Sequence, residues 1–166
     1  MKVLRVQNIS NDCIICGEQN PAGVKARFLE LEDGQLCALA TFRLIHQSYP
    51  GRVHGGLITA LLDETIGRTI NIAEPDTWGV TAELTLRFRK PVPYDMPLRC
   101  LGRITKNTRR IFEGEGELLL DDGTIAATAT ATFFKVPIDT LMPNQAEFAQ
   151  LGWRQPDNAE AFLHLE

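Results

Sequence analysis

The chain has 166 residues, of which 44% are hydrophobic and 23% are charged, a balance typical of a single globular domain and not of a disordered chain. The formal net charge of −4 provides no basic field to attract nucleic acid or an anionic membrane, so neither is expected as a partner. The densest apolar runs, 57–62 and 125–134, are shorter than the ~20 residues that cross a bilayer, and residues 1–11 carry no long apolar stretch. These features predict a cytoplasmic protein.

Residues 1–23 form a turn-rich lead-in, which ends in Gly-Glu-Gln-Asn-Pro-Ala-Gly. Cys13 and Cys16 in this lead-in make one C-x-x-C motif. A structural zinc site usually takes four ligands, commonly from two such pairs, and the sequence has no second pair. His46 and His54 would complete a site only if the fold brought them there. The expected interpretation is a turn with two free thiols and no metal.

The next elements are two strands, near 24–31 and 36–43, joined by a turn whose Asp33-Gly34 is a hairpin signal. A loop at 47–53 follows. Gly55 to about Ala73 is predicted to be the one long helix, and Pro75 lies beyond its end. Its apolar residues recur at helical spacing: Leu57, Ile58, Leu61, Leu62, Ile66 and Ile70.

The remainder of the domain is predicted to be β-structure. Apolar and polar residues alternate over 80–88, and further strands are expected near 98–106, 110–120 and 124–135. The expected inner faces carry small residues, which let a helix lie close to a sheet: Gly102, Gly114, Gly116, Ala127, Ala129 and Ala131. The sequence therefore predicts an α+β domain over residues 1–137, with one long central helix wrapped by a long antiparallel sheet. Residues 138–166 form a tail, in which a short helix is expected near 145–151.

The segment that precedes the helix suggests chemistry. Gly55 and Gly56 place backbone N–H groups at the predicted helix N-terminus, where the helix dipole favours negative charge. An oxyanion that develops during acyl transfer needs such donors. The absence of side chains at these glycines also lets a substrate approach the backbone. A glycine pair before a helix is nevertheless more often only a turn.

A carboxylate, Asp63, lies two turns further along the predicted helix. On a helical wheel it shares a face with small residues: Gly56, Thr59, Ala60 and Gly67. A carboxylate in a groove of small residues suits a base or nucleophile that needs space for a substrate, with Gly56 and Gly67 lining that groove. Taken alone, an acidic residue within a helix is more often a solvated surface charge. Glu64, about 100° away on the wheel, is expected to be such a charge.

Taken together, these motifs resemble a known family. The chain has His54-Gly55-Gly56 nine residues before Asp63, then Thr81 in a strand that leads to Arg89-Lys90-Pro91-Val92-Pro93. This arrangement resembles the hotdog-fold acyl-CoA thioesterases of the phenylacetate-degradation and thioesterase-superfamily-member type. The Cys-x-x-Cys-Gly at 13–17 and Asn-Pro-x-Gly at 20–23 are similar to a preamble in part of that group. The resemblance covers about residues 13–136 and implies the hotdog fold.

The resemblance also implies roles for individual residues. The Gly55 N–H would polarise the thioester carbonyl, and Asp63 would activate water or attack directly. Thr81 would help to hold that water or the carboxylate, and His54 would shape the loop at the carbonyl. Arg89 and Lys90 would be candidates for binding the phosphates of coenzyme A, which is part of the substrate, and no separate cofactor is expected.

The sequence departs from the family pattern at two places. Related enzymes commonly have an amide a few residues before the His-Gly-Gly, where this chain has Gln47 and Ser48, and often a hydroxyl one turn after the acid, where it has Gly67. Two other functions stay open. One is a non-catalytic acyl-CoA sensor, which would keep the groove and lose the carboxylate, whereas Asp63 is present here. The other is an enoyl-CoA hydratase of the same fold, whose aspartate is followed five residues later by a histidine, where this chain has Arg68.

The spacing of the two key groups bears on the oligomeric state. Eight residues separate Gly55 from Asp63, which is about 12 Å along a helix, too far for both to meet one carbonyl. A homodimer, or a homotetramer built as a dimer of dimers, is therefore expected, with Gly55 of one subunit facing Asp63 of the other. Strand alternation groups Thr81 with Glu83 and Arg87 on the solvent-facing side. Thr81 is thus expected to reach the site only at a subunit boundary.

Overall fold

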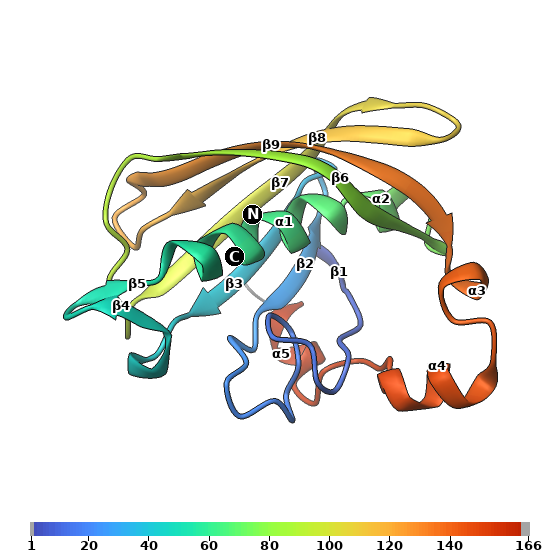
Figure 1. The fold of residues 1–166 in the computed structure, drawn as a ribbon, viewed down its shortest axis with the longest axis horizontal. Helices are drawn as coiled ribbons and strands as arrows, with labels where there is room; N and C mark the ends of the chain where they lie inside the picture. Colours follow the sequence, from blue (N-terminus) through green and yellow to red (C-terminus); the bar gives the residue numbers. More distant parts are fainter. Residues whose placement is uncertain (1, 164–166) are drawn as a thin grey trace.

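A computed structural model, which describes residues 2–163, contains one long helix held against a seven-stranded antiparallel sheet that bends around it (Figure 1). The strands, in spatial order, are β1 (Val3–Val6), β2 (Arg27–Leu31), β3 (Leu36–Thr41), β7 (Pro97–Asn107), β8 (Ile111–Leu119), β9 (Ile125–Pro137) and β6 (Thr77–Phe88). The predicted α+β architecture of a central helix wrapped by a long antiparallel sheet is therefore confirmed.

The long helix is shorter than the sequence suggested. It divides into α1 (Gly55–Gly67) and a single turn, α2 (Ile70–Ala73). The break follows Gly67, a residue with low helix propensity. Thr69 closes a tighter turn there, because its N–H (3.1 Å) and its Oγ1 (2.6 Å) both donate to the Ile66 carbonyl. The expectation of one continuous helix to Ala73 is thus wrong at this joint.

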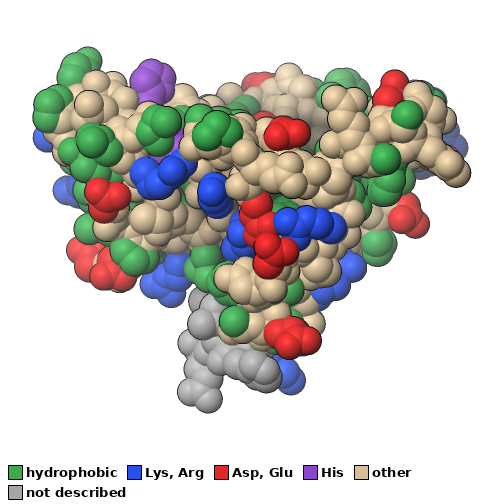
Figure 2. Space-filling model, turned by 90° about the horizontal axis from the view of Figure 1, so that it is seen from below, with side chains coloured by type: hydrophobic (Ala, Val, Ile, Leu, Met, Phe, Trp, Pro, Cys, Tyr) green, Lys and Arg blue, Asp and Glu red, His purple; other side chains and the backbone are tan. Residues whose placement is uncertain are grey.

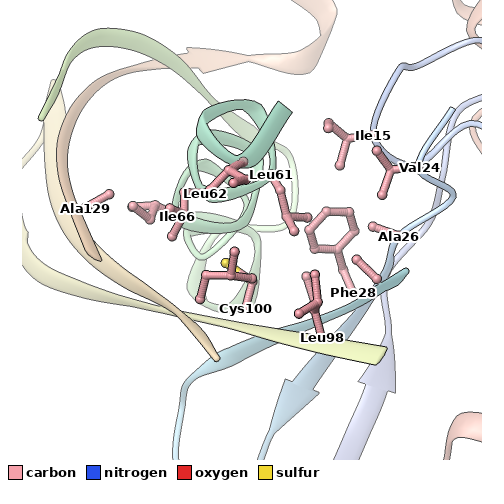
Figure 3. Packing of buried hydrophobic residues seen from close by; sticks show 14 of the residues in the cluster. Ile15, Val24, Ala26, Phe28, Leu61, Leu62, Ile66, Leu98, Cys100 and Ala129 are labelled. Atoms are coloured by element: carbon pink, nitrogen blue, oxygen red, sulfur yellow. The ribbon is translucent and has the colours of Figure 1, made fainter. Parts of the chain in front are cut away.

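Close contact between α1 and the sheet depends on the small residues predicted for the inner face. A Cβ added to Gly114 would lie 2.6 Å from Ile66 Cγ2, and one added to Gly116 would lie 2.9 Å from Ile66 Cγ1. A Cβ on Gly102 would lie 3.1 Å from the Thr65 carbonyl oxygen. Figure 3 shows Leu61, Leu62 and Ile66 of α1 packed between the sheet and the lead-in. These glycines set the distance between helix and sheet.

Three local features differ from the expectations. β2 begins at Arg27 and not near 24, because Lys25 has a φ of 61°, which interrupts extended backbone. β1, at the edge of the sheet, lies inside the segment expected to consist of turns. The predicted loop over 47–53 contains a small hairpin of β4 (Gln47–Tyr49) and β5 (Arg52–Val53), preceded by the 3-10 turn η1 (Leu44–His46).

A β-bulge in β6 changes which side chains face the helix. Thr81 pairs with Phe133, whereas Glu83 pairs with the next residue on β9, Thr132, so Ala82 is the extra residue. Such a bulge reverses the alternation of side chains beyond it. Thr81 therefore shares the inner face with Phe133 of β9, although strict alternation had placed it on the solvent side. Thr81 therefore needs no second subunit to reach Asp63, and the prediction that its strand begins at a subunit boundary stays a prediction.

The lead-in and the tail pack together on the side of α1 away from β8 and β9. The tail contains α3 (Ile138–Leu141), α4 (Gln145–Leu151) and α5 (Ala159–Phe162). Glu18 of the lead-in forms ion pairs with both Arg27 and Arg154, and Ile9 and Arg154 exchange two backbone hydrogen bonds. On the face shown in Figure 2, acidic and basic side chains lie next to one another and not in separate patches.

None of the helices within residues 2–163 combines the length and the apolar character needed to cross a membrane.

Candidate active site

Asp63 and Thr81 meet on the inner face of the fold. The Thr81 Oγ1 donates a hydrogen bond of 2.8 Å to Asp63 Oδ1. Both residues line a cavity of about 280 Å³, and Gly67 lies one turn beyond Asp63 in the same wall. A Cβ on Gly67 would lie 3.0 Å from the Phe133 ring, so the glycine keeps this part of the wall close-packed. Three of the residues predicted for the site, Asp63, Gly67 and Thr81, thus line the same cavity.

The environment of Asp63 changes its acidity. Burial raises the pKa of the Asp63 carboxyl above its ordinary value of 3.8, and the hydrogen bond from Thr81 opposes that shift. The negative charge of Glu64 adds to the increase in the pKa of Asp63. A partly desolvated carboxylate is a stronger base than one in water, which suits proton abstraction from a bound water molecule.

The backbone N–H groups of the first two residues of α1 differ: that of Gly56 is in use and that of Gly55 is free. His54 is the N-cap, and its Nδ1 accepts a 2.9 Å hydrogen bond from the Gly56 N–H. The imidazole can come this close because Gly56 lacks a side chain; a Cβ there would lie 3.0 Å from Nδ1. The Gly55 N–H, in contrast, donates to no backbone or side-chain acceptor within residues 2–163. Gly55 is therefore the donor that is left for an oxyanion.

Gly55 and Asp63 lie at different ends of the site. They are the first and ninth residues of α1, about 12 Å apart along the helix axis. Phe88, the last residue of β6, approaches Gly55, since a Cβ added to Gly55 would lie 3.4 Å from the Phe88 ring. The exposed residues Arg89 and Lys90 follow directly, at the Gly55 end. One chain therefore does not bring the predicted donor and the predicted base to a common point.

Glu64 does not occupy the solvated position expected for it. Its side chain is only 21% exposed and forms an ion pair of 2.8 Å with Arg68, one turn further along the chain. The Cys13 thiol donates a 3.2 Å hydrogen bond to Glu64 Oε2, and Arg68 Nη2 donates to Cys16 Sγ at 3.2 Å. The lead-in thus attaches to α1 beside the cavity, and Cys13, Glu64 and Arg68 all line its wall.

The two thiols of the C-x-x-C differ in acidity. The hydrogen bond from Cys13 lowers the pKa of the Cys16 thiol to about 7, and the Arg68 guanidinium also favours the thiolate. The same hydrogen bond, together with burial, raises the pKa of the Cys13 thiol. Cys16 is therefore the more acidic of the two thiols. Neither candidate histidine reaches them: His46 Nδ1 accepts from the Arg43 N–H and its Nε2 contacts the Ala22 carbonyl oxygen, while His54 caps α1.

Aromatic residues that the sequence did not indicate close the cavity. Trp78 of β6 and Trp153 of the tail have ring centroids 5.1 Å apart, and Phe133 of β9 lies in the same wall. The Arg68 guanidinium lies 5.2 Å from the Trp153 ring centroid. No local pattern could have revealed Trp153, because its partners are more than 70 residues away in the chain. The cavity behind Asp63 is thus bounded by the lead-in and the tail as well as by the helix.

Comparison with known proteins gives a consistent result. A sequence model of the thioesterase superfamily matches residues 50–127, which include the His-Gly-Gly segment, Asp63 and Thr81. A mouse protein, acyl-coenzyme A thioesterase THEM4, is 33% identical over 91 residues. That match covers 54% of this chain and 38% of the mouse protein, so the chain corresponds to less than half the length of this relative.

Solved structures agree in fold. The thioesterase superfamily protein RHA08564 matches with a TM-score of 0.68 at 26% identity, over 76% of this chain and 61% of that one. The BH2602 protein of Bacillus halodurans, crystallised with CoA, matches with a TM-score of 0.56 at 28% identity, over 60% of this chain and 70% of that one.

Proposed function

We propose that this chain, which belongs to the thioesterase superfamily and has the hotdog fold that its sequence predicts, hydrolyses the thioester bond of an acyl-coenzyme A. The observation that carries the proposal is the pair of Asp63 and Thr81: a carboxylate of raised pKa, held at 2.8 Å by a hydroxyl, in the wall of a cavity. The mouse relative is named as an acyl-coenzyme A thioesterase, and the Bacillus halodurans structure contains CoA.

In the proposed reaction, Asp63 takes a proton from water, whose oxygen adds to the thioester carbonyl carbon. The carbon–sulfur bond then breaks, and coenzyme A leaves as a thiolate that takes up a proton. Thr81 holds the carboxylate, or the water beside it, in position. Direct attack by the Asp63 carboxylate, followed by hydrolysis of an anhydride, uses the same residues.

The carbonyl oxygen is assigned to the free N–H of Gly55, strengthened by the N-terminal end of the α1 dipole. His54 positions that turn, because its ring caps the neighbouring Gly56 N–H. Arg89 and Lys90, exposed at the Gly55 end, are proposed to contact the phosphates of coenzyme A. The acyl group is proposed to enter the cavity past Gly67, towards the aromatic wall.

The site is proposed to form between two subunits. An edge strand with unpaired backbone groups is prone to pair with another chain, and β6 is such an edge. It exposes large apolar side chains, with Val80 42% and Phe88 56% exposed. Antiparallel pairing of β6 with its copy across a two-fold axis would set Gly55 of one chain against Asp63 of the other. Further assembly into a dimer of dimers and a cytoplasmic location stay predictions.

The test is release of free thiol from a panel of short-chain, long-chain and aryl acyl-CoAs. The wild type should release thiol from at least one of them. Asp63→Asn keeps the shape and can still accept the hydrogen bond from Thr81, but lacks the base. Its kcat should fall by ~10²–10⁴, the usual effect of losing a positioned base.

The matched control is Asp139→Asn, an exposed carboxylate in the tail, which should leave kcat unchanged. If Asp63→Asn kept a third of the wild-type turnover, the assignment of the base would be wrong. Tight binding of acyl-CoA by the wild type without any thiol release would instead identify a sensor.

A further inference from the structure

We propose that Cys13, Cys16 and Glu64 form a binding site for one zinc ion, separate from the chemistry assigned to Asp63. Their ligand atoms, two sulfurs and one carboxylate oxygen, all lie within 4.8 Å of one another. Cys16 is buried, and the other two are half-buried. Sulfur and carboxylate ligands of this number match those of zinc sites, in which three protein groups leave one position of a tetrahedron open.

The lead-in provides a prearranged pair of sulfur ligands. The backbone N–H groups of Ile15 and Cys16 each donate to Cys13 Sγ at 3.3 Å. Hydrogen bonds to sulfur favour the thiolate, the form that binds a metal. The sequence alone offered only these two ligands, so a turn without metal was expected. The fold adds the third from α1, 51 residues away.

Arg68 orients the ligands without occupying the metal position. Its Nε donates to Glu64 Oε1 at 2.9 Å, which leaves Oε2 directed towards Cys13 Sγ, 3.2 Å away. Its Nη2 donates to Cys16 Sγ at 3.2 Å, and its Nη1 is held by the Asn8 carbonyl at 2.8 Å. Groups that hydrogen-bond to metal ligands in this way fix their orientation.

The charges of the cluster also fit a divalent cation. With both thiols deprotonated, two thiolates and one carboxylate carry three negative charges, and Arg68 neutralises one of them. Two negative charges remain for Zn²⁺ to balance. In the metal-free form the Cys13 thiol keeps its proton and donates it to Glu64. Binding of the metal therefore displaces this proton, as thiolate coordination requires.

The open fourth position is expected to face the cavity behind Asp63. Cys13 and Glu64 both line that cavity, whereas Cys16 does not. The fourth ligand would accordingly be a water molecule or a donor atom of a molecule bound in the cavity. In the metal-free form, the Cys13–Glu64 hydrogen bond attaches the lead-in to α1. The bound ion would make this attachment at the same point.

The experiment uses the full chain, purified with reductant and shown by thiol titration to have all four cysteines free. After chelator treatment and buffer exchange, Co²⁺ is added and the absorption spectrum recorded, and Zn²⁺ is then titrated in competition. One equivalent of Co²⁺ should give the thiolate-to-metal charge-transfer and visible bands of a tetrahedral site. One equivalent of Zn²⁺ should remove them.

Variants distinguish this site from adventitious binding. Cys13→Ala should abolish the bands. Glu64→Gln should weaken Zn²⁺ binding by about tenfold or more, because even groups that only support metal ligands contribute 10–100-fold. The matched control is Cys37→Ala, a buried thiol on β3 remote from the cluster, which should bind as the wild type does.

Glu64→Gln serves a second purpose: it nearly preserves the shape of the side chain, so it tests the third ligand if loss of Cys13 prevents folding. A wild type without cobalt–thiolate bands would overturn the proposal. So would equal Zn²⁺ affinity in wild type and Glu64→Gln. Each readout is independent of thiol release, so failure here leaves the assignment of Asp63 intact.

Discussion

The surroundings of the Asp63 carboxylate disfavour its ionised form. Its carboxylate is partly withdrawn from water, a single hydroxyl hydrogen-bonds to it, and the negatively charged Glu64 is its neighbour. No positive charge among the causes of its pKa shift compensates for burial. A carboxyl whose pKa is raised in this way destabilises the folded chain when it is ionised. Carboxyl groups with such shifted pKa values concentrate at functional sites.

The direction of the pKa shift predicts how stability depends on pH. The folded chain holds the Asp63 proton more tightly than the unfolded chain, so this residue's contribution to stability decreases as pH rises from about 3.8 through the raised pKa. At neutral pH the ionised group is destabilising. Asp63→Asn should therefore melt at the same temperature as the wild type or higher at pH 7, and the gap should narrow as the pH is lowered.

The same shift predicts the acid limb of the activity profile. Loss of kcat/KM on acidification should have its midpoint above 3.8, because the base must be ionised. Thr81→Val removes the hydrogen bond that opposes the shift, so it should move this midpoint to higher pH. Calorimetric melting measures the effect of pH on stability, and pH–rate profiles measure the midpoint of the activity. A midpoint that falls in Thr81→Val would contradict the role given to Thr81.

At the scale of elements, the contact between α1 and the sheet fixes where Asp63 and Thr81 meet. Gly114 and Gly116 of β8 lie directly under Ile66, three residues after Asp63 on the same helix. The bulge at Ala82 then turns Thr81 towards the helix. A change in the helix-to-sheet distance therefore affects the Thr81–Asp63 hydrogen bond as well as the packing.

Gly114→Ala should destabilise the fold by ~1–3 kcal/mol, the usual effect of overfilling a close-packed core. The added Cβ would lie 2.6 Å from Ile66 Cγ2 and 2.9 Å from the Arg103 carbonyl oxygen. In an Ile66→Ala background the contact with Ile66 Cγ2 is absent. Gly114→Ala should therefore lower the free energy of unfolding by less in that background. Urea unfolding of the four proteins in this double-mutant cycle measures the coupling. Equal costs in both backgrounds would mean that helix and sheet are not in close contact at this point.

At the scale of the whole molecule, the predicted donor and the predicted base lie too far apart in one chain to act on one carbonyl. The edge strand β6, with its exposed apolar side chains, offers the surface through which a second copy would complete the site. The lead-in and the tail close the opposite side of the cavity, so an acyl group that entered it as proposed would meet Trp153 of the tail.

Complementation between two inactive variants tests the shared site. Gly55→Pro removes the N–H donor at the first helical position, where proline is well tolerated, and the extended backbone of His54 (ψ of 129°) is compatible with a following proline. Random exchange with Asp63→Asn makes roughly half of the dimers mixed, each with one intact site of two, so about a quarter of wild-type activity should return. The recovered activity is measured as thiol release after subunit exchange.

Gly55→Ala is the matched control, because it keeps the N–H and its Cβ would make only an ordinary contact, at 3.4 Å, with Phe88. By itself it should be more active than Gly55→Pro, because only the proline removes the N–H donor. Verified mixed dimers without activity, or an active monomeric wild type, would refute the shared site.

The sequence by itself determined the features that depend on local spacing. Helical periodicity located α1, the turn residues Gly34 and Gly123 located the hairpins, and the small residues of β7, β8 and β9 indicated a helix in close contact with the sheet. The tertiary structure alone decided which side Thr81 faces, because one bulge residue reverses the alternation of a strand. It also decided the surroundings of Glu64. Cys13 and Trp153 reach the cavity from segments distant in the chain, and no local pattern encodes contacts between such segments.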